Sequence, residues 1–216
     1  MKYSAVIAAA GSSTRFHHVT SKMLYEFEDG TRVIDRTLKL FVEDEDCRQI
    51  VVVSTGDVFE YLSSTRYLGK MVICYGGATR QESVFNGLLA SMEEITLVHD
   101  GARCYLLKED LEKVKENVTM DTGVILCKPE TDTVKETDEE GYVIRTIDRS
   151  RLKRAQTPQA FRTDELLRCY KKAFEEGFVA TDDAQIIEKY SDMKIKLVES
   201  TGHNTKVTTL DDVKGG

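Results

Sequence analysis

The sequence predicts an α/β fold with a mostly parallel, twisted β-sheet that is covered by helices on both faces. Two observations support this prediction. Short apolar runs that end in turn signals recur along the chain, and stretches with helical periodicity separate them. Strands that alternate with helices of this length are typical of such a sheet. Ligands of these sheets bind beyond the carboxyl ends of the strands, so the loops that follow the strands are where chemistry is expected.

The expected elements follow one another in a regular order. The first apolar run, residues 3–9, has the continuous hydrophobicity of a strand buried on both faces. Further strands of this kind are expected at 50–54, 71–74, 96–99, 123–127 and 194–198. Apolar residues at helical spacing predict one helix across 33–42 and another across 84–92. The remaining helices are expected at 107–118, 164–176 and 182–190.

Residues 128–155 break this alternation. The segment is polar, β-branched and charged, and it has a turn signal at 138–141. Residues 131–136 and 142–147 flank the turn like the two strands of a hairpin. An isolated hairpin is marginally stable in water, so we expect this one to pack against a second subunit. The sequence thus predicts a single domain spanning residues 1–216, with a protruding β-hairpin arm at about 128–155.

Composition and charge exclude several classes of protein. The net charge of −7 argues against general nucleic-acid binding, which leaves a basic footprint. The five cysteines are dispersed without C-x-x-C spacing, as in proteins of a reducing compartment, and no zinc-type cluster is present. No apolar run is long enough to span a membrane, and the N-terminus leads directly into a strand without a signal-peptide pattern. We therefore expect a cytoplasmic protein that binds neither nucleic acid nor membrane.

The loop after the first strand is small and flexible. Its backbone N–H groups can turn inward around an anion, and Arg15 and Lys22 add cationic phosphate donors. It matches neither common nucleotide-binding fingerprint, since the P-loop pattern is absent and Ser13 stands where the second glycine of G-x-G-x-x-G belongs. Taken alone, it is equally consistent with an ordinary strand-to-helix turn. The loop consists of Ala9, Ala10, Gly11, Ser12, Ser13, Thr14 and Arg15.

A second loop, residues 76–84, again joins a strand to a helix. Gly76 and Gly77 permit close backbone approach, and the helix N-terminus favours negative charge or a polar base edge. A glycine turn with Thr79 as the helix N-cap explains the same residues equally well.

The third loop places Asp100 and Arg103 at a strand end. Asp100 could bind Mg²⁺, which takes one or two carboxylates together with phosphate oxygens, or it could form an ion pair with Arg103. His99 is interpreted as a packed strand residue.

Several later segments are more polar than plain loops need to be. They are Asp132-Thr133, Asp148-Arg149, residues 156–159, residues 181–183 and Lys206. Each also has a structural interpretation. Thr181 or Asp182 would cap the following helix, and Lys206 would be a solvated strand charge.

The order of these motifs is more specific than any one of them. The series AAAGSSTR, SK, GGATRQESV, VHDGAR, DTVK, DRSRL, QTPQAF, TDDA and NTKVTT closely resembles the 2-C-methyl-D-erythritol 4-phosphate cytidylyltransferase family, from Val6 to about Asp212. The resemblance implies a Rossmann-like nucleotidyltransferase. With Mg²⁺, such an enzyme converts CTP and methylerythritol phosphate into 4-diphosphocytidyl-2-C-methyl-D-erythritol and pyrophosphate, in isoprenoid precursor biosynthesis.

The resemblance also implies roles for individual residues. Arg15 and Lys22 would be catalytic, and Asp100 would bind the metal. The implied nucleotide-binding residues are Ala9, Ala10, Gly11, Ser12, Gly76, Gly77, Arg80, Ser83, Asp100 and Ala102. The implied substrate-binding residues are Arg103, Thr133, Arg149, Thr181 and Lys206. In this family the hairpin arm crosses to a partner, so Thr133 and Arg149 would complete the neighbour's site in a homodimer.

The chain departs from the family pattern at a few positions. Ser21-Lys22-Met23 replaces Pro-Lys-Gln, and Ala78 replaces an acidic or polar residue. The HD-A-AR-P motif contains Gly101 and Cys104 in place of its first alanine and its proline. None of these changes removes a charged residue to which the resemblance assigns a catalytic or binding role.

Three alternative functions share parts of the pattern. A ribitol-5-phosphate cytidylyltransferase of wall polymer synthesis would have the same loops, but the Ala9-Ala10-Gly11 loop and residues 132–135 favour methylerythritol phosphate. A catalytically silent nucleotide-binding regulator is disfavoured by retention of Arg15, Lys22, Asp100 and Arg103. A dinucleotide-dependent dehydrogenase is disfavoured because the first loop lacks its glycine pattern.

Overall fold

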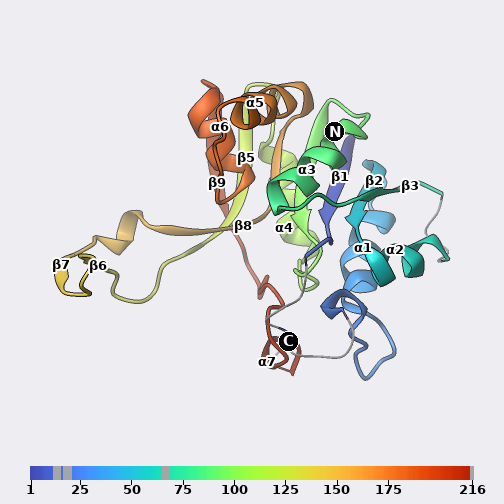
Figure 1. Cartoon of the computed structure of the whole chain (residues 1–216), viewed down its shortest axis with the longest axis horizontal. Coiled ribbons are helices and arrows are strands. Elements are labelled where there is room, and N and C mark those ends of the chain that lie inside the picture. Colours follow the sequence, from blue (N-terminus) through green and yellow to red (C-terminus); the bar gives the residue numbers. More distant parts are fainter. Residues whose placement is uncertain (12–15, 17–20, 65–68, 215–216) are drawn as a thin grey trace.

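A computed structural model describes residues 1–11, 16, 21–64 and 69–214 of the chain. These residues form a seven-stranded sheet of order β3-β2-β1-β4-β8-β5-β9 and a separate two-stranded sheet, β6-β7 (Figure 1). In the large sheet, β8 runs antiparallel to both of its neighbours, β4 and β5. The other neighbouring pairs are parallel. The predicted mostly parallel α/β fold is confirmed.

The elements alternate along the chain as expected. The strands of the large sheet are β1 (Tyr3–Ala8), β2 (Cys47–Ser54), β3 (Met71–Tyr75), β4 (Ile95–Asp100), β5 (Thr122–Pro129), β8 (Lys153–Arg162) and β9 (Lys194–Glu199). The α-helices are α1 (Val33–Glu43), α2 (Gly56–Ser63), α3 (Arg80–Leu89), α4 (Lys108–Asn117), α5 (Thr163–Glu175), α6 (Asp183–Tyr190) and α7 (Asp211–Lys214). The described residues also contain two 3₁₀ turns, η1 (Lys22–Leu24) and η2 (Arg149–Arg151).

Two apolar clusters cover the two faces of the sheet. One contains side chains of α1, α2 and α4, such as Phe41, Leu62 and Val114. The other contains side chains of α3, α5 and α6, such as Leu88 and Tyr170. Burial of these faces is the main force that holds the helices on the sheet. None of the helices that the structure describes is long and apolar enough to cross a membrane.

Strand β8 is an element that the sequence pattern did not predict. Its polar stretch Gln156–Gln159 lies buried in the sheet between β4 and β5. Gln159 satisfies its buried amide by donating to Gln156 O at 3.3 Å and to Asp182 Oδ2 at 2.9 Å, and by accepting from Ala184 N. A strand that is buried through hydrogen bonds of polar side chains lacks the run of apolar residues that predicts a buried strand. The sequence pattern also did not predict helix α2.

The hairpin arm is present, with strands shorter than predicted. Strand β6 (Lys135–Thr137) pairs with β7 (Val143–Thr146), and the turn has Gly141 at a φ of 92°. The arm leaves the sheet at the ends of β5 and β8 and extends away from the α/β body (Figure 1).

Candidate active site

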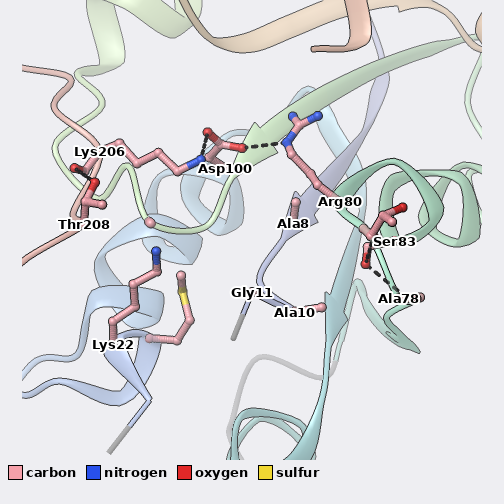
Figure 2. A pocket seen from close by; sticks show the side chains of 14 residues that line it. Ala8, Ala10, Gly11, Lys22, Ala78, Arg80, Ser83, Asp100, Lys206 and Thr208 are labelled. Atoms are coloured by element: carbon pink, nitrogen blue, oxygen red, sulfur yellow. Dashed lines mark hydrogen bonds and ion pairs between the residues drawn. The ribbon is translucent and has the colours of Figure 1, made fainter. Parts of the chain in front are cut away.

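A cavity of about 360 Å³ opens at the carboxyl ends of β1 and β4. This is the edge of the sheet where the fold class places its ligands, and the volume lies in the range of small-molecule sites. Its walls come from the loops after β1, β3 and β4, from η1 and from the C-terminal segment (Figure 2). The lining residues are Ala8, Ala10, Gly11, Lys22, Met23, Gly77, Ala78, Thr79, Arg80, Ser83, Asp100, Ala102, Lys206 and Thr208.

The first two loops touch at their glycine and alanine residues. A Cβ at Gly76 would lie 2.3 Å from the Cβ of Ala10, and a Cβ at Gly77 would lie 2.3 Å from the Cβ of Glu82. Both positions therefore require glycine for close approach. The amide of Gly77 donates to Ser83 Oγ at 3.1 Å, and this hydroxyl donates to Thr79 O at 2.8 Å. Ser83 thus fixes the turn whose backbone faces the cavity.

Thr79 also has the capping role expected of it. Its side chain accepts from Glu82 N at the start of α3. The second loop is therefore both a capped helix start and a wall of the cavity.

Asp100 ends β4 among cations from three different segments. Its Oδ1 lies 3.2 Å from Arg80 Nε, and its Oδ2 lies 2.9 Å from Lys206 Nζ and 3.4 Å from Arg103 Nε. Burial alone would raise the pKa of Asp100, but the charges of Arg80, Lys206 and Arg103 lower it well below its ordinary value. The carboxylate is therefore ionised, and positive charge predominates around it. Figure 2 shows Asp100 between Lys206 and Arg80, with the Lys22 ammonium directed toward the same space.

Buried polar groups fix the turn that carries Asp100 and Arg103. Thr157 Oγ1 accepts from Asp100 N at 3.0 Å and lies 3.0 Å from His99 Nδ1, while His99 Nε2 lies 3.2 Å from Arg103 O. A carbonyl only accepts, so Nε2 of His99 carries the proton, and the Thr157 hydroxyl donates to Nδ1. The imidazole of His99 thus contacts one end of the turn directly, at Arg103 O, and the other end through Thr157, which bonds to Asp100 N. His99 is a buried strand residue, as predicted.

Burial of His99 makes a pH-dependent contribution to stability. Burial lowers the pKa of the imidazole to about 4, although the Asp100 charge opposes the shift. Below the ordinary value near 6.5, the unfolded chain takes up this proton and the folded chain does not. The contribution of His99 to the free energy of unfolding is therefore fully present above about pH 6.5. It is lost as the pH decreases toward 4, and the loss is on the order of 3 kcal/mol.

Urea unfolding of the wild type and of His99→Gln between pH 7 and 5 measures this contribution. We expect the wild type to lose stability more steeply than the variant over this interval. The carboxylates with the lowest pKa, such as Asp46 and Glu165 at about 2, titrate at more acidic pH. Equal slopes for the two proteins would mean that His99 does not titrate as described.

The C-terminal segment is attached to the same turn through its backbone. Asn204 is fully buried and donates from Nδ2 to Thr157 O at 2.7 Å, while its own carbonyl accepts from Arg103 Nη1 at 2.8 Å. Val207 N donates to Ala102 O at 2.8 Å. These bonds place Lys206 between two anchored residues. The structural alternative for Lys206, a solvated strand charge, is wrong, because the residue lies outside the strands and pairs with Asp100.

The cavity brings together many of the residues that the sequence singled out. Those that line it are Ala10, Gly11, Lys22, Gly77, Arg80, Ser83, Asp100, Ala102 and Lys206. Ala9, Gly76 and Arg103 adjoin it through the contacts of their loops. Ser12 and Arg15 lie outside the described residues. The sequence did not assign Ala8, Met23, Ala78, Thr79 or Thr208 to the site, although Thr208 belongs to the NTKVTT motif.

Of the five predicted substrate residues, only Lys206 lines the cavity among the described residues, and Arg103 adjoins it; the other three lie away from it. Thr133 and Arg149 are exposed on the arm. Thr181 is exposed before α6, where Asp182 and not Thr181 caps the helix by accepting from Gln185 N at 2.9 Å.

The fold and the cavity define a Rossmann-like α/β enzyme whose cationic site suits phosphorylated ligands. A family model for 2-C-methyl-D-erythritol 4-phosphate cytidylyltransferase matches residues 3–215. A cytidylyltransferase of that name from Shouchella clausii is 38% identical, covering 99% of this chain and 94% of the relative. One from Caldanaerobacter subterraneus is 35% identical, covering 99% and 96%. The crystal structure of 4-diphosphocytidyl-2C-methyl-D-erythritol synthase from Anaerococcus prevotii aligns with a TM-score of 0.87 at 32% identity, covering 99% and 94%.

The chain therefore belongs to the 2-C-methyl-D-erythritol 4-phosphate cytidylyltransferase family. The predictions of family, fold and enzyme class are confirmed, and the protein is a nucleotidyltransferase. The expected function is confirmed with them. It is CTP-dependent cytidylyl transfer to methylerythritol phosphate in isoprenoid precursor biosynthesis.

Proposed function

We propose that the cavity at the ends of β1 and β4 is where CTP and methylerythritol phosphate react. The observation that supports this most strongly is the buried carboxylate of Asp100, which is held among Arg80, Arg103 and Lys206. Such a cluster leaves excess positive charge facing a cavity whose other lining residues are mostly small, apart from Lys22 and Met23. It suits two polyanionic substrates that must approach each other.

The proposed contacts divide between the two substrates. The triphosphate lies along the first loop, from Ala9 to Ser12, with Arg15 and Lys22 as the catalytic cations. The cytosine lies against Gly76, Gly77 and Ser83, and the ribose lies near Asp100 and Ala102. Methylerythritol phosphate lies on the side of Arg103, Thr181 and Lys206. The contacts of the described residues support this division, because the loops after β1, β3 and β4 meet at one cavity.

Mg²⁺ fits this site when it arrives with the triphosphate. Asp100 is the carboxylate among the described residues that line the cavity, and no group of three His, Cys, Asp or Glu side chains suited to a metal was found in the described ranges. Mg²⁺ is commonly held by one or two carboxylates together with substrate phosphates. We propose that Asp100 holds it. When bound, Mg²⁺ neutralises charge on phosphate oxygens.

The reaction needs positioning and charge stabilisation more than proton transfer. A phosphate monoester has a second pKa near 6, so the attacking oxygen is already ionised at neutral pH. It needs no general base, and His99 is enclosed in fixed hydrogen bonds and stays neutral. Lys206 and Arg103 hold the incoming phosphate near the α-phosphate. Lys22 and Arg15 stabilise the charge that develops as the leaving pyrophosphate departs.

The arm is proposed to complete the site of a second subunit in a homodimer. Three consecutive apolar side chains on the arm, Tyr142, Val143 and Ile144, are 69%, 60% and 59% exposed. Such a run on a short hairpin supports a partner surface. Arg149 and Thr133 belong to the same arm and would reach the neighbour's methylerythritol phosphate.

Arg149→Ala tests the role of the arm. We expect it chiefly to raise KM for methylerythritol phosphate, by about 10-fold or more, because a charge-assisted bond to phosphate is lost. Arg145→Ala is the matched control, since Arg145 is exposed on β7 and pairs with Glu136 of the same hairpin. A variant that weakened only CTP binding would show that the arm has been misassigned.

Mixed dimers show whether the arm acts in the neighbour's site. With methylerythritol phosphate supplied well below KM, Lys22→Ala and Arg149→Ala subunits are each impaired, but a mixed dimer has one site built from two intact contributions. Mixing and subunit exchange should therefore restore activity to about a quarter of the wild-type level or more. Additive residual activity would place Arg149 in its own subunit's site.

A pyrophosphate-release assay tests the proposed reaction as a whole. The four common nucleoside triphosphates are each supplied with Mg²⁺ and with methylerythritol phosphate or ribitol 5-phosphate. We expect release with CTP and methylerythritol phosphate. Preference for ribitol 5-phosphate would support the wall-polymer alternative, and tight CTP binding without release would support the silent regulator.

We also propose that residues 1–216 form one nucleotidyltransferase domain with an arm at about 128–155, and that the protein acts in the cytoplasm. The shared seven-stranded sheet supports the single domain. The five cysteines are unpaired, and Cys47, Cys104, Cys127 and Cys169 are buried, which supports a reducing compartment.

A further inference from the structure

The guanidinium of Arg80 is committed to two carboxylates. Arg80 begins α3, and its Nε donates to Asp100 Oδ1 at 3.2 Å. Its Nη1 and Nη2 donate to the two oxygens of Asp183, at 3.2 and 2.8 Å. In Figure 2 the terminal nitrogens of Arg80 point away from Lys22. A bidentate pair of this kind fixes the orientation of both groups.

Asp183 is a fully buried carboxylate that no other role explains. It begins α6, but Asp182 already caps this helix. The hydroxyl of Tyr170 on α5 also donates to Asp183 Oδ1. Burial, with the Asp183 charge, raises the pKa of Tyr170 well above its ordinary value, so the hydroxyl stays protonated as a donor. A buried charge is costly even when paired, and helix capping does not require this one.

These contacts form a continuous chain from α5 to the site. It runs from Tyr170 through Asp183 and Arg80 to Asp100, and so connects α5, α6, α3 and the end of β4. Arg80 reaches Asp100 on Oδ1, while Lys206 and Arg103 lie on the Oδ2 side. If Arg80 were free to turn, the carboxylate would be held from one side only.

We infer that Asp183 is a positioning residue for cytidylyl transfer, which holds Arg80 so that Arg80 orients Asp100. On this inference, which rests on the proposed function of the cavity, Arg80 acts through Asp100 and does not bind the nucleotide directly. This revises the role that the sequence motif suggested for Arg80. It also gives the second aspartate of the TDDA motif a function.

Asp183→Asn tests the inference, since it keeps the shape of the side chain and removes the charge. Arg80→Met alone would leave Asp183 buried without its partner and could unfold the protein, so Arg80→Met/Asp183→Asn is the second variant. Asp44→Asn is a matched control. Asp44 also accepts from a tyrosine hydroxyl, Tyr3 at 2.7 Å, and pairs with a cation, Lys115 at 3.0 Å. Asp44 follows α1 and contacts Tyr3 at the start of β1, whereas the cavity lies at the other end of that strand.

Steady-state kinetics, CTP binding by calorimetry without divalent metal, and thermal unfolding are measured for all four proteins. We expect Asp183→Asn to lower kcat about 10-fold, the scale on which partners that orient a working ligand act, while the Kd for CTP changes less than about 3-fold. The double variant should be no more than about 3-fold slower than Asp183→Asn, because both changes break one chain of contacts. Asp44→Asn should lower the unfolding temperature and leave kcat unchanged.

Two results would overturn the inference. Asp183→Asn could behave like Asp44→Asn, with lower thermal stability and normal kcat. Alternatively, the double variant could lose CTP affinity in proportion to its loss of kcat/KM while Asp183→Asn retains both, which would make Arg80 a direct nucleotide contact. Either result with an active wild type leaves the proposed function intact. An inactive wild type with CTP and methylerythritol phosphate would instead contradict the proposed function itself.

Discussion

Lys22→Ala is expected to lower kcat by about 100-fold or more, because one preorganised donor to a developing charge is worth several kcal/mol. Lys22 lies on the cavity wall in η1, opposite Asp100 and Lys206. The next residue, Met23, is buried and anchors the turn, so loss of the Lys22 side chain should leave the backbone in place. Rapid-quench measurement of the first turnover, with both substrates saturating, gives the rate of the chemical step.

The comparison of kcat with KM tells how Lys22 acts. A cation that binds the triphosphate equally in the ground state and the transition state would raise KM for CTP and leave kcat unchanged. A cation that acts on the departing pyrophosphate lowers kcat. Lys39→Ala is the control, since Lys39 is an exposed lysine on α1 paired with Glu43. Near-normal turnover by Lys22→Ala would remove Lys22 from the mechanism.

The parts of the fold with a strong apolar period could be predicted from the sequence. Strands β1, β2 and β4 are buried apolar runs, and α1 and α5 bury one face. Strand β8 could not be predicted in this way, since Gln156, Thr157 and Gln159 are buried through specific hydrogen bonds that depend on distant residues. Periodicity reports burial of apolar side chains and carries no information on such partners.

The candidate site shows the same division. The small residues and cations of the loops could be found from their positions after strands, because parallel strands bring these loops to one edge. The ion pair of Asp100 with Arg103 could also be predicted, because the two residues are neighbours in one loop. The charge partners that come from distant segments could not. Thr181-Asp182-Asp183 looked like a helix cap, and Asp182 does cap α6. Nothing local indicated that Asp183 would turn inward to a side chain 103 positions away.

Asp100→Asn is expected to separate binding from turnover. An amide presents one acceptor oxygen where a carboxylate presents two, so Arg80 or Lys206 loses its partner on Asp100. The cavity also becomes more positive by one charge. The Kd for CTP without divalent metal should therefore stay the same or fall, by up to about 10-fold, since a unit charge a few ångströms away contributes a few kcal/mol before screening.

Although Asp100→Asn should bind CTP at least as tightly as the wild type without metal, its turnover should be slower. We expect kcat with Mg²⁺ to fall by about 100-fold, because the variant lacks the carboxylate proposed to hold the metal and orders Arg103 and Lys206 poorly. The variant should also lose stability, because Arg103 and the partly exposed Arg80 and Lys206 lose their counter-charge. The Asp44→Asn control should lose stability alone.

If CTP bound more weakly to Asp100→Asn in the absence of metal, Asp100 would be a direct hydrogen-bond acceptor for the nucleotide. The cluster of Arg80, Arg103 and Lys206 would then owe its arrangement to that contact, and charge balance around a metal-bound triphosphate would not explain it.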